Sequence, residues 1–379
     1  MKRRSFLQIG ALSAASALVI PDSQLKASAT GTYFALTIAA CNVEMIDGTM
    51  CYMLAYFRNG LEPNPEMRVT EGQSITIEVT NSDDERHGFA IPGIAAATIQ
   101  SIEPGLTATV TFAAPYGGSY LYVDPYKAPL NRVLGLHGAF IVEPVEGTTY
   151  AYSPTPFSRT QHTPQVRAFF DALGGGNIRF PGNKWDPADA QREKLWLFSQ
   201  TDPLLNASVA AGQSVNPSAV VGTFLPRYFT INGVSGFDTA FHSADHSGTS
   251  PASRIMPSGR QGQPTLIRTM NAGLATHAVH IHGNHCMICS ESDANGYCVV
   301  QSQVYELDTW LLKPMMRSDL VLPFERPPDI PTGAWPLREE PWPLRYVMHC
   351  HCEMSQTAGG GNYPQGAVTH WEMTGPLQV

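Results

Sequence analysis

Two short stretches of the sequence concentrate side chains that bind soft and borderline metals. They are HAVHIHG, which contains His277, His280 and His282, and HCH, which contains His349, Cys350 and His351. Imidazole nitrogen and thiolate sulfur are typical ligands of copper and zinc. Neighbouring imidazoles are costly in an apolar core unless each has a partner. We therefore expect both stretches to bind metal.

Strand geometry sorts these ligands onto two faces. Side chains alternate along a β-strand, so His280 and His282 share one face, and the two histidines of HCH share another. Cys350 points away from its two neighbours, and His277 faces away from His280 or lies in the preceding loop. One strand can thus supply two imidazoles to one site and a thiolate to a second. We expect a set of four imidazoles on one side and a Cys350–His277 pair on the other.

The Cys350–His277 pair needs further ligands if it holds copper. Two His, one Cys and a weak axial Met form the blue-copper arrangement. His370 and Met373 lie C-terminal to Cys350 and complete that set. Met354 competes for the axial position, which can also be empty. Zinc also accepts Cys and His, so these residue types alone do not exclude it.

The pattern HxxHxHG followed by HCH, with His and Met beyond, resembles the multicopper oxidase family of cupredoxin-fold proteins. The likeness includes YFTING, DTWLLKP and VLPFERPPDIP and covers nearly the whole second half of the chain. The resemblance implies that His277, Cys350 and His370 bind type 1 copper. It also implies that the four-imidazole set is the C-terminal half of a type 2/type 3 copper cluster. Cys350, His349 and His351 are then the catalytic residues, because their strand carries electrons between the two sites.

The sequence departs from that family in both halves. The second type 1 His usually follows the Cys by five residues, where this chain has Ser355, so a Gly-rich insertion moves the predicted ligand to His370. In the first half, two His-x-His pairs are reduced to His87, with His137 as the only other His nearby. We expect a mononuclear or dinuclear copper site rather than a full trinuclear cluster. In a homotrimer, His87 of a neighbouring copy could reach the four-imidazole face.

The remaining sequence predicts an all-β protein. The chain has 33 Gly, 30 Pro and 15% charged residues, which favours turn-rich β structure over helices. Short runs of alternating apolar and polar residues recur between turn signals in both halves. We expect two cupredoxin-like Greek-key β-barrel or sandwich domains, at 30–145 and 191–379, joined by a Pro- and Gly-rich linker at 146–190.

Residues 1–29 are expected to be a signal peptide. They contain a basic start, a short apolar run and an Ala-Ser-Ala cleavage signal. Arg3 and Arg4 are typical of the twin-arginine signal of bacterial export, with an ordinary secretory signal as the alternative. We therefore expect a periplasmic or secreted protein without a membrane span in its mature form. Two disulfides are also expected in that compartment, Cys41–Cys51 and Cys289–Cys298.

Charge excludes one class of partner. The formal net charge is −8, and removal of four basic and one acidic residue with the signal peptide makes it −11. An acidic protein is a poor partner for nucleic acid or an anionic membrane.

The sequence predicts an exported copper oxidoreductase with type 1 copper and type 2/type 3-like copper. A small-molecule or protein electron donor would be oxidised at type 1 copper, and O2 or another small acceptor would be reduced at the His-bound copper. Two alternatives stay open. One is a nitrite-reductase-like copper enzyme, and the other is a non-catalytic electron-transfer or copper-binding protein.

Overall fold

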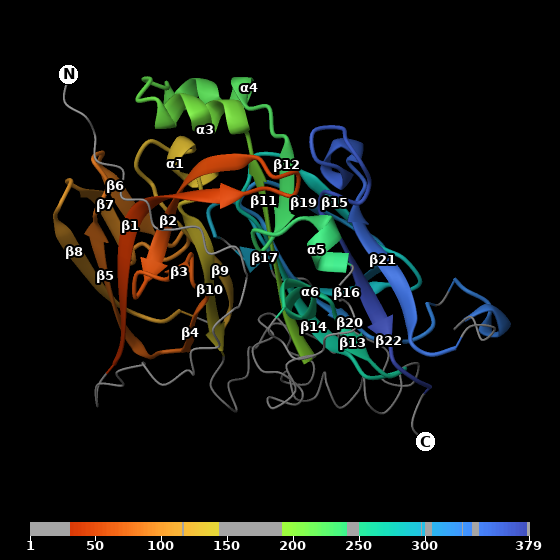
Figure 1. The fold of residues 1–379 in the computed structure, drawn as a ribbon. Helices are drawn as coiled ribbons and strands as arrows, with labels where there is room; N and C mark the ends of the chain where they lie inside the picture. The colour runs from red at the N-terminus through yellow and green to blue at the C-terminus, as the bar shows by residue number, and fades with distance from the viewer. Residues whose placement is uncertain are drawn as a thin grey trace.

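The computed structural model describes residues 31–115, 117–143, 192–240, 250–296, 298–299, 305–327, 329–335 and 341–376. The predicted signal peptide and the predicted linker at 146–190 lie outside these residues. The described chain is dominated by strands arranged in curled sheets, which confirms the predicted all-β class. Figure 1 shows the first half of the chain, in red to gold, beside the second half, in green to blue.

The first half forms two five-stranded sheets in the orders β3-β2-β1-β5-β8 and β4-β10-β9-β6-β7. The strands are β1 (Thr32–Glu44), β2 (Met50–Arg58), β3 (Glu62–Pro63), β4 (Met67–Thr70), β5 (Ser74–Asn81), β6 (His87–Ala90), β7 (Thr98–Ile102), β8 (Thr107–Ala113), β9 (Gly118–Val123) and β10 (His137–Glu143). Apolar side chains from both sheets share one core. In β5, for example, Ile75, Ile77 and Val79 are buried and the intervening residues are not.

The second half forms a seven-stranded and a five-stranded sheet. The larger has the order β12-β11-β14-β20-β16-β17 with β18 also paired to β16, and the smaller has the order β13-β22-β21-β15-β19. The strands are β11 (Glu193–Thr201), β12 (Tyr228–Ile231), β13 (Ser258–Gly259), β14 (Thr265–Asn271), β15 (His277–Ile281), β16 (Cys286–Ser292), β17 (Cys298–Val299), β18 (Tyr305–Leu307), β19 (Thr309–Leu312), β20 (Arg317–Leu322), β21 (Leu344–Cys350) and β22 (Val368–Met373).

Helices in the described residues are short and lie in connections. They are α1 (Leu130–Val133), α3 (Pro203–Ala210), α4 (Val220–Thr223), α5 (Gly236–Ala240) and α6 (Pro251–Ile255), with 3-10 turns η2 (Pro217–Ala219), η3 (Thr332–Ala334) and η4 (Glu353–Gln356). Asp202 caps α3 by accepting hydrogen bonds from two backbone N–H groups of its first turn. Within the described residues, no helix has the length and apolar character needed to cross a membrane.

A buried charge network joins the two halves. Glu193 of β11 accepts hydrogen bonds from Arg68 of β4 at 2.7 Å and from Arg268 of β14 at 2.8 Å. Arg268 also donates to Ser119 of β9 at 3.2 Å and lies 3.5 Å from Asp319 of β20. Charges this deep are stable only when paired, so the network fixes how the halves pack.

Candidate metal centre

Two neighbouring strands bring the histidine motifs together. β15 and β21 pair antiparallel, with His280 opposite His349 and Val279 opposite Cys350. The ladder continues past both strand ends, because the His351 N–H donates to the Ala278 carbonyl oxygen at 2.8 Å. The predicted alternation therefore holds, and Figure 1 shows both strands in the sheet at the edge of the molecule.

Four imidazoles cluster on one face of this strand pair, which we call the four-His face. They belong to His280, His282, His349 and His351. Ring centroids of neighbouring members are 4.6–5.5 Å apart. The Nε2 atoms of His282 and His349 are 3.1 Å apart. One ring nitrogen each of His280, His349 and His351 lies within 4.8 Å of the others. His280 and His349 are half-buried, and His282 and His351 are exposed, so an ion can reach the cluster from solvent.

Hydrogen bonds orient two of these rings. His280 Nδ1 lies 3.0 Å from the Asp308 carbonyl oxygen and 2.8 Å from Thr309 Oγ1. His349 Nδ1 lies 3.2 Å from the Cys350 carbonyl oxygen. A carbonyl oxygen accepts only, so each Nδ1 carries the proton and each Nε2 keeps its lone pair for the cluster. Metal-binding histidines are commonly held by this kind of partner.

Burial and repulsion between neighbouring imidazoles favour the neutral form of two members of the four-His face. Burial lowers the pKa of His282, and its three neighbouring histidines lower it further. Burial also lowers the pKa of His349, against the opposing effect of its hydrogen bond to the Cys350 carbonyl. The neutral imidazole is the form that binds metal, so both shifts favour metal binding by His282 and His349.

The four-His face fits a copper or zinc ion. The Nε2 atoms of His282 and His349 are 3.1 Å apart. If one ion lay about 2.0–2.1 Å from each of them, the N–metal–N angle would be roughly 100°. Such an angle lies between those of square-planar and tetrahedral sites. An all-imidazole donor set suits copper and zinc better than calcium or magnesium, which prefer oxygen.

Cys350 and His277 meet on the opposite face, as the alternation predicts. His277 Nδ1 lies 3.3 Å from Cys350 Sγ, and both side chains are fully buried. Phe198 and Phe229 pack against the His277 ring, with centroids 4.9 Å and 6.4 Å away. Burial lowers the pKa of His277 to about 4 and raises the pKa of the Cys350 thiol.

His370 and Met373 are not brought to this pair, which corrects the predicted type 1 ligand set. His370 lies opposite Val347, three positions along β21 from Cys350 and therefore on the other face. Met373 lies opposite Leu344, six positions from Cys350, or about 20 Å along the strand at 3.3 Å per residue. Met354, the competing axial residue, is 62% exposed. The β21–β22 pairing determines these positions, and motif spacing carried no information about it.

Two residues near Cys350 were not identified as functional from the sequence. Ser355, at the position where the family usually has its second type 1 His, is buried and hydrogen-bonds the Cys350 thiol. Gln200 of β11 lies 2.6 Å from His277 Nε2 through its own Nε2 atom. The Cys-to-His spacing of the family pointed to the first of these positions. No local signal pointed to Gln200, which is 77 residues from its partner.

His87, one of the seven histidines among the predicted metal ligands, does not join the four-His face of this chain. Its Nδ1 is 2.8 Å from Asp124 Oδ2 and its Nε2 is 2.9 Å from Asp83 Oδ2, so both nitrogens face carboxylates. Burial lowers the pKa of His87, but these hydrogen bonds outweigh burial and raise it to about 9. The protonated ring has no lone pair for a metal. Figure 1 also places β6 and β21 on opposite sides of the molecule.

The His87 charge predicts a pH dependence of stability. Its pKa of about 9 in the folded chain exceeds the ordinary value of 6.5. Its stabilisation is therefore complete below pH 6.5 and is lost as pH rises through 9, amounting to about 2–3 kcal/mol. Denaturant unfolding at pH 6 and pH 9.5 measures this. The loss should be smaller in His87→Gln, which has no group that titrates there, and an equal loss in both proteins would contradict this role.

The predicted disulfides are absent from the cysteines that the structure describes. Cys41 and Cys51 sit on paired strands but oppose Met53 and Val43 rather than each other, and both are free thiols. Cys289 is also a free thiol, so its predicted bridge to Cys298 is wrong. Proximity in sequence, on which both predictions depended, does not ensure that two thiols face each other.

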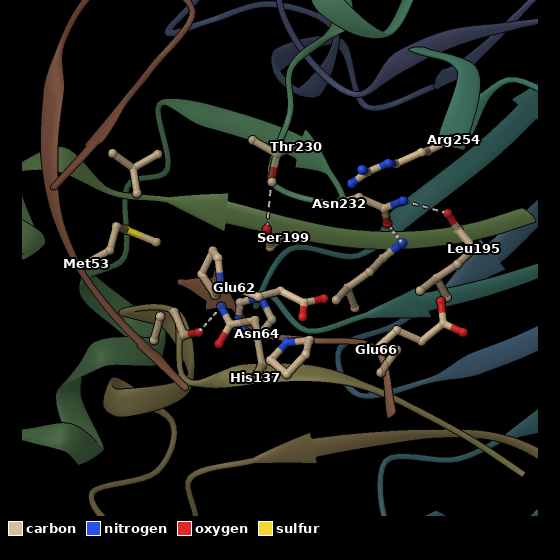
Figure 2. Close-up of a pocket in the computed structure, with 18 of the residues that line it drawn as sticks. Met53, Glu62, Asn64, Glu66, His137, Leu195, Ser199, Thr230, Asn232 and Arg254 are labelled. Carbon is tan, nitrogen blue, oxygen red and sulfur yellow. Dashed lines mark hydrogen bonds between the residues drawn. The ribbon is translucent and has the colours of Figure 1, made fainter. Parts of the chain in front are cut away.

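A separate cavity of 770 Å³ lies between the two halves. Figure 2 shows His137, Asn64 and Asn232 among its lining side chains. His137 Nδ1 is 2.9 Å from the Arg132 carbonyl oxygen, and burial lowers its pKa to about 4. Asn64 and Asn232 donate to backbone carbonyl oxygens at 2.9 Å and 2.8 Å. These partners explain the buried polar groups as parts of the domain junction.

The comparisons agree with the fold and the motifs. Residues 41–147 match the family model of multicopper oxidases. Copper resistance protein A of Escherichia coli is 32% identical over 155 residues, which are 38% of this chain and 24% of that protein. The blue copper oxidase of Nitrosomonas europaea has a similar structure, with a TM-score of 0.62 at 19% identity, over 90% of this chain and 85% of that chain.

A copper nitrite reductase of Nitrosomonas europaea also shares the fold, with a TM-score of 0.53 at 15% identity, over 90% of this chain and 93% of that chain. These findings confirm the resemblance to the multicopper oxidase family and the cupredoxin-like fold. The chain is therefore similar to multicopper oxidases and spans 24% of the length of copper resistance protein A. Copper is the metal that these relatives support. The stretch that matches the family model contains two histidines, His87 and His137.

Proposed function

We propose that this chain is an exported copper-binding protein whose four-His face holds the copper. The observation that carries the proposal is the 3.1 Å distance between the Nε2 atoms of His282 and His349, beside the ring nitrogens of His280 and His351. Ring nitrogens of His280, His349 and His351 thus lie within 4.8 Å of one another, and His282 adds a nitrogen next to that of His349. Export through the twin-arginine route is part of the proposal, and the amino-terminal Arg-Arg motif supports it.

The residues of the face have distinct roles in holding copper. Asp308 and Thr309 fix the His280 ring through its Nδ1 atom, and the Cys350 carbonyl oxygen fixes His349 in the same way. Each ring then directs Nε2 toward the cluster, so these two side chains lose little conformational entropy when a metal binds. Bound copper would supply a one-electron redox centre.

A second candidate is the oxidoreductase predicted from the sequence, with a one-electron donor and O2 or nitrite as acceptor. The contact between His277 and Cys350 favours it, because Cys350 lies between two histidines of the four-His face along the chain. The oxidoreductase needs copper at Cys350, whereas copper binding at the four-His face does not need a metal there. The predicted homotrimer, in which His87 of a neighbouring copy would reach the four-His face, remains a prediction for both candidates.

Copper content and turnover together test the proposal. We expect purified chain incubated with Cu(II) and desalted to retain copper, with an electron paramagnetic resonance signal of nitrogen-ligated Cu(II). Steady O2 or nitrite consumption with a one-electron donor would establish the second candidate. A chain that retains no copper after desalting would contradict the first.

A further inference from the structure

The Cys350 sulfur is surrounded by hydrogen-bonding groups. The backbone N–H groups of Cys352 and Ala278 donate to the sulfur. The Ser355 hydroxyl donates its one proton to the Cys352 carbonyl oxygen at 2.6 Å, so its oxygen accepts from the thiol. His277 Nδ1 lies 3.3 Å from Cys350 Sγ on a further side. The blue-copper arrangement needs a thiolate and two imidazoles. Among the residues that the structure describes around this thiol, His277 supplies one imidazole and a second is missing.

Gln200 stabilises the His277 tautomer that is protonated on Nδ1, the nitrogen that faces the Cys350 sulfur. This tautomer cannot bind a metal next to the sulfur. Its Oε1 accepts hydrogen bonds from the Leu274 and Ala275 N–H groups at 2.8 Å and 3.0 Å, which sets the orientation of the amide. The amide nitrogen therefore faces His277 Nε2, 2.6 Å away, and must donate to it. The proton of the neutral ring is then on Nδ1, the atom that faces the sulfur.

The neighbouring residues restrict the Gln200 side chain to one conformation. A Cβ atom at Gly273 would lie 1.7 Å from Gln200 Oε1, so the side chain occupies space that only glycine leaves open. Gln200 itself is 2% exposed. Reversal of the amide would place its N–H2 group against two backbone N–H donors and leave these buried groups without an acceptor, so the observed orientation is strongly favoured.

We infer that the pocket around Cys350 does not bind copper, and that Ser355 and Gln200 together exclude it. Ser355 stands where the family's usual spacing has a second imidazole, and its hydroxyl is engaged with the Cys352 carbonyl oxygen at 2.6 Å as well as with the thiol. Gln200 occupies the nitrogen that should be protonated in a copper-bound His277. The pocket is instead a buried, hydrogen-bonded thiol–imidazole pair, and electrons cannot enter the chain through a type 1 centre.

The inference is independent of copper at the four-His face, and paired variants separate the two. We expect wild type and Cys350→Ser, loaded with Cu(II), to retain equal copper and to lack the blue thiolate-to-copper(II) absorption. Ser355→His supplies the missing imidazole, and Gln200→Glu supplies an acceptor for His277 Nε2–H while still accepting from Leu274 and Ala275. The double variant Ser355→His/Gln200→Glu is expected to gain the blue absorption, and the same variant with Cys350→Ser is expected to lose it.

Each outcome decides between the alternatives. Blue absorption in the wild type that disappears in Cys350→Ser would overturn the inference, whatever the four-His face binds. A folded double variant without the absorption, as judged by circular dichroism, would contradict the role given to Ser355 and Gln200. If the double variant does not fold, the comparison of wild type with Cys350→Ser still decides whether the thiol binds copper. Loss of all copper from both proteins would refute the four-His site while leaving this inference intact.

Discussion

Replacement of His349 by Ala is expected to lower the affinity for Cu(II) by at least about 100-fold. His349 Nε2 is 3.1 Å from His282 Nε2 and one of its ring nitrogens lies within 4.8 Å of those of His280 and His351, so the ring contacts the rest of the cluster. Even residues that only orient a ligand typically change metal affinity by about 10–100-fold, and removal of the ligand itself costs more. Circular dichroism of the variant checks that its fold is retained.

Competition with a chelator of known copper affinity measures this effect. His285→Ala is the matched control, because His285 belongs to the same motif region but its Nε2 lies 3.4 Å from Asp329 rather than in the cluster. We expect the control to bind Cu(II) as the wild type does. Equal loss in both variants would mean that binding depends on histidine content rather than on the four-His face.

Replacement of Glu193 by Ala is expected to destabilise the chain by about 3–5 kcal/mol, the cost of breaking a buried ion pair. Glu193 accepts from Arg68 and Arg268, and the Arg268 side chain is 0% exposed. Without Glu193, Arg268 loses its closest carboxylate partner where the two halves meet, and Asp319 lies farther away, at 3.5 Å. The variant leaves a cation without its main counter-charge in a site that water does not reach.

Denaturant unfolding at neutral pH tests this, with Glu62→Ala as the control. Glu62 pairs with Arg58 at the surface, at 2.6 Å, and such pairs contribute about 0–1 kcal/mol. Burial raises the pKa of Glu193, but the two arginines lower it to about 2. Its stabilisation is therefore full above pH 4.5 and is lost as pH falls toward 2. Similar midpoints for the two variants would contradict a structural role for the network.

The metal-binding strands could be predicted because their signals are local. Alternation of side chains along HAVHIHG and HCH places His280 and His349 on one face and Cys350 on the other, and β15 and β21 have that arrangement. The all-β class likewise follows from repeated local alternation between turns. Neither inference needs knowledge of which distant strands pair.

The remaining ligands depended on long-range pairing that spacing does not encode. His370 follows Cys350 by 20 residues, but the register with Val347 puts it on the opposite face. His87 looked like a remnant ligand because its partners, Asp83 and Asp124, become neighbours only in the folded chain. Gln200 carries no motif and acts through a contact 77 residues away.

The sequence resemblance implies both a multicopper oxidase fold and copper at Cys350, but the structure supports only the fold. The fold and the HCH motif resemble those of multicopper oxidases, whereas the Cys350 pocket has Ser355 in place of a second imidazole and Gln200 against His277 Nε2. Copper binding is thus assigned to the four-His face, which faces solvent and needs no electron from Cys350.

Pulsed electron paramagnetic resonance of the Cu(II)-loaded wild type tests the central claim most directly, because it identifies the nuclei coupled to the metal. We expect a single class of copper that is coupled to several imidazole nitrogens and not to cysteine β-protons. We expect this copper signal to disappear in His349→Ala. Copper coupled to the β-protons of Cys350, or a spectrum unchanged by His349→Ala, would contradict the claim.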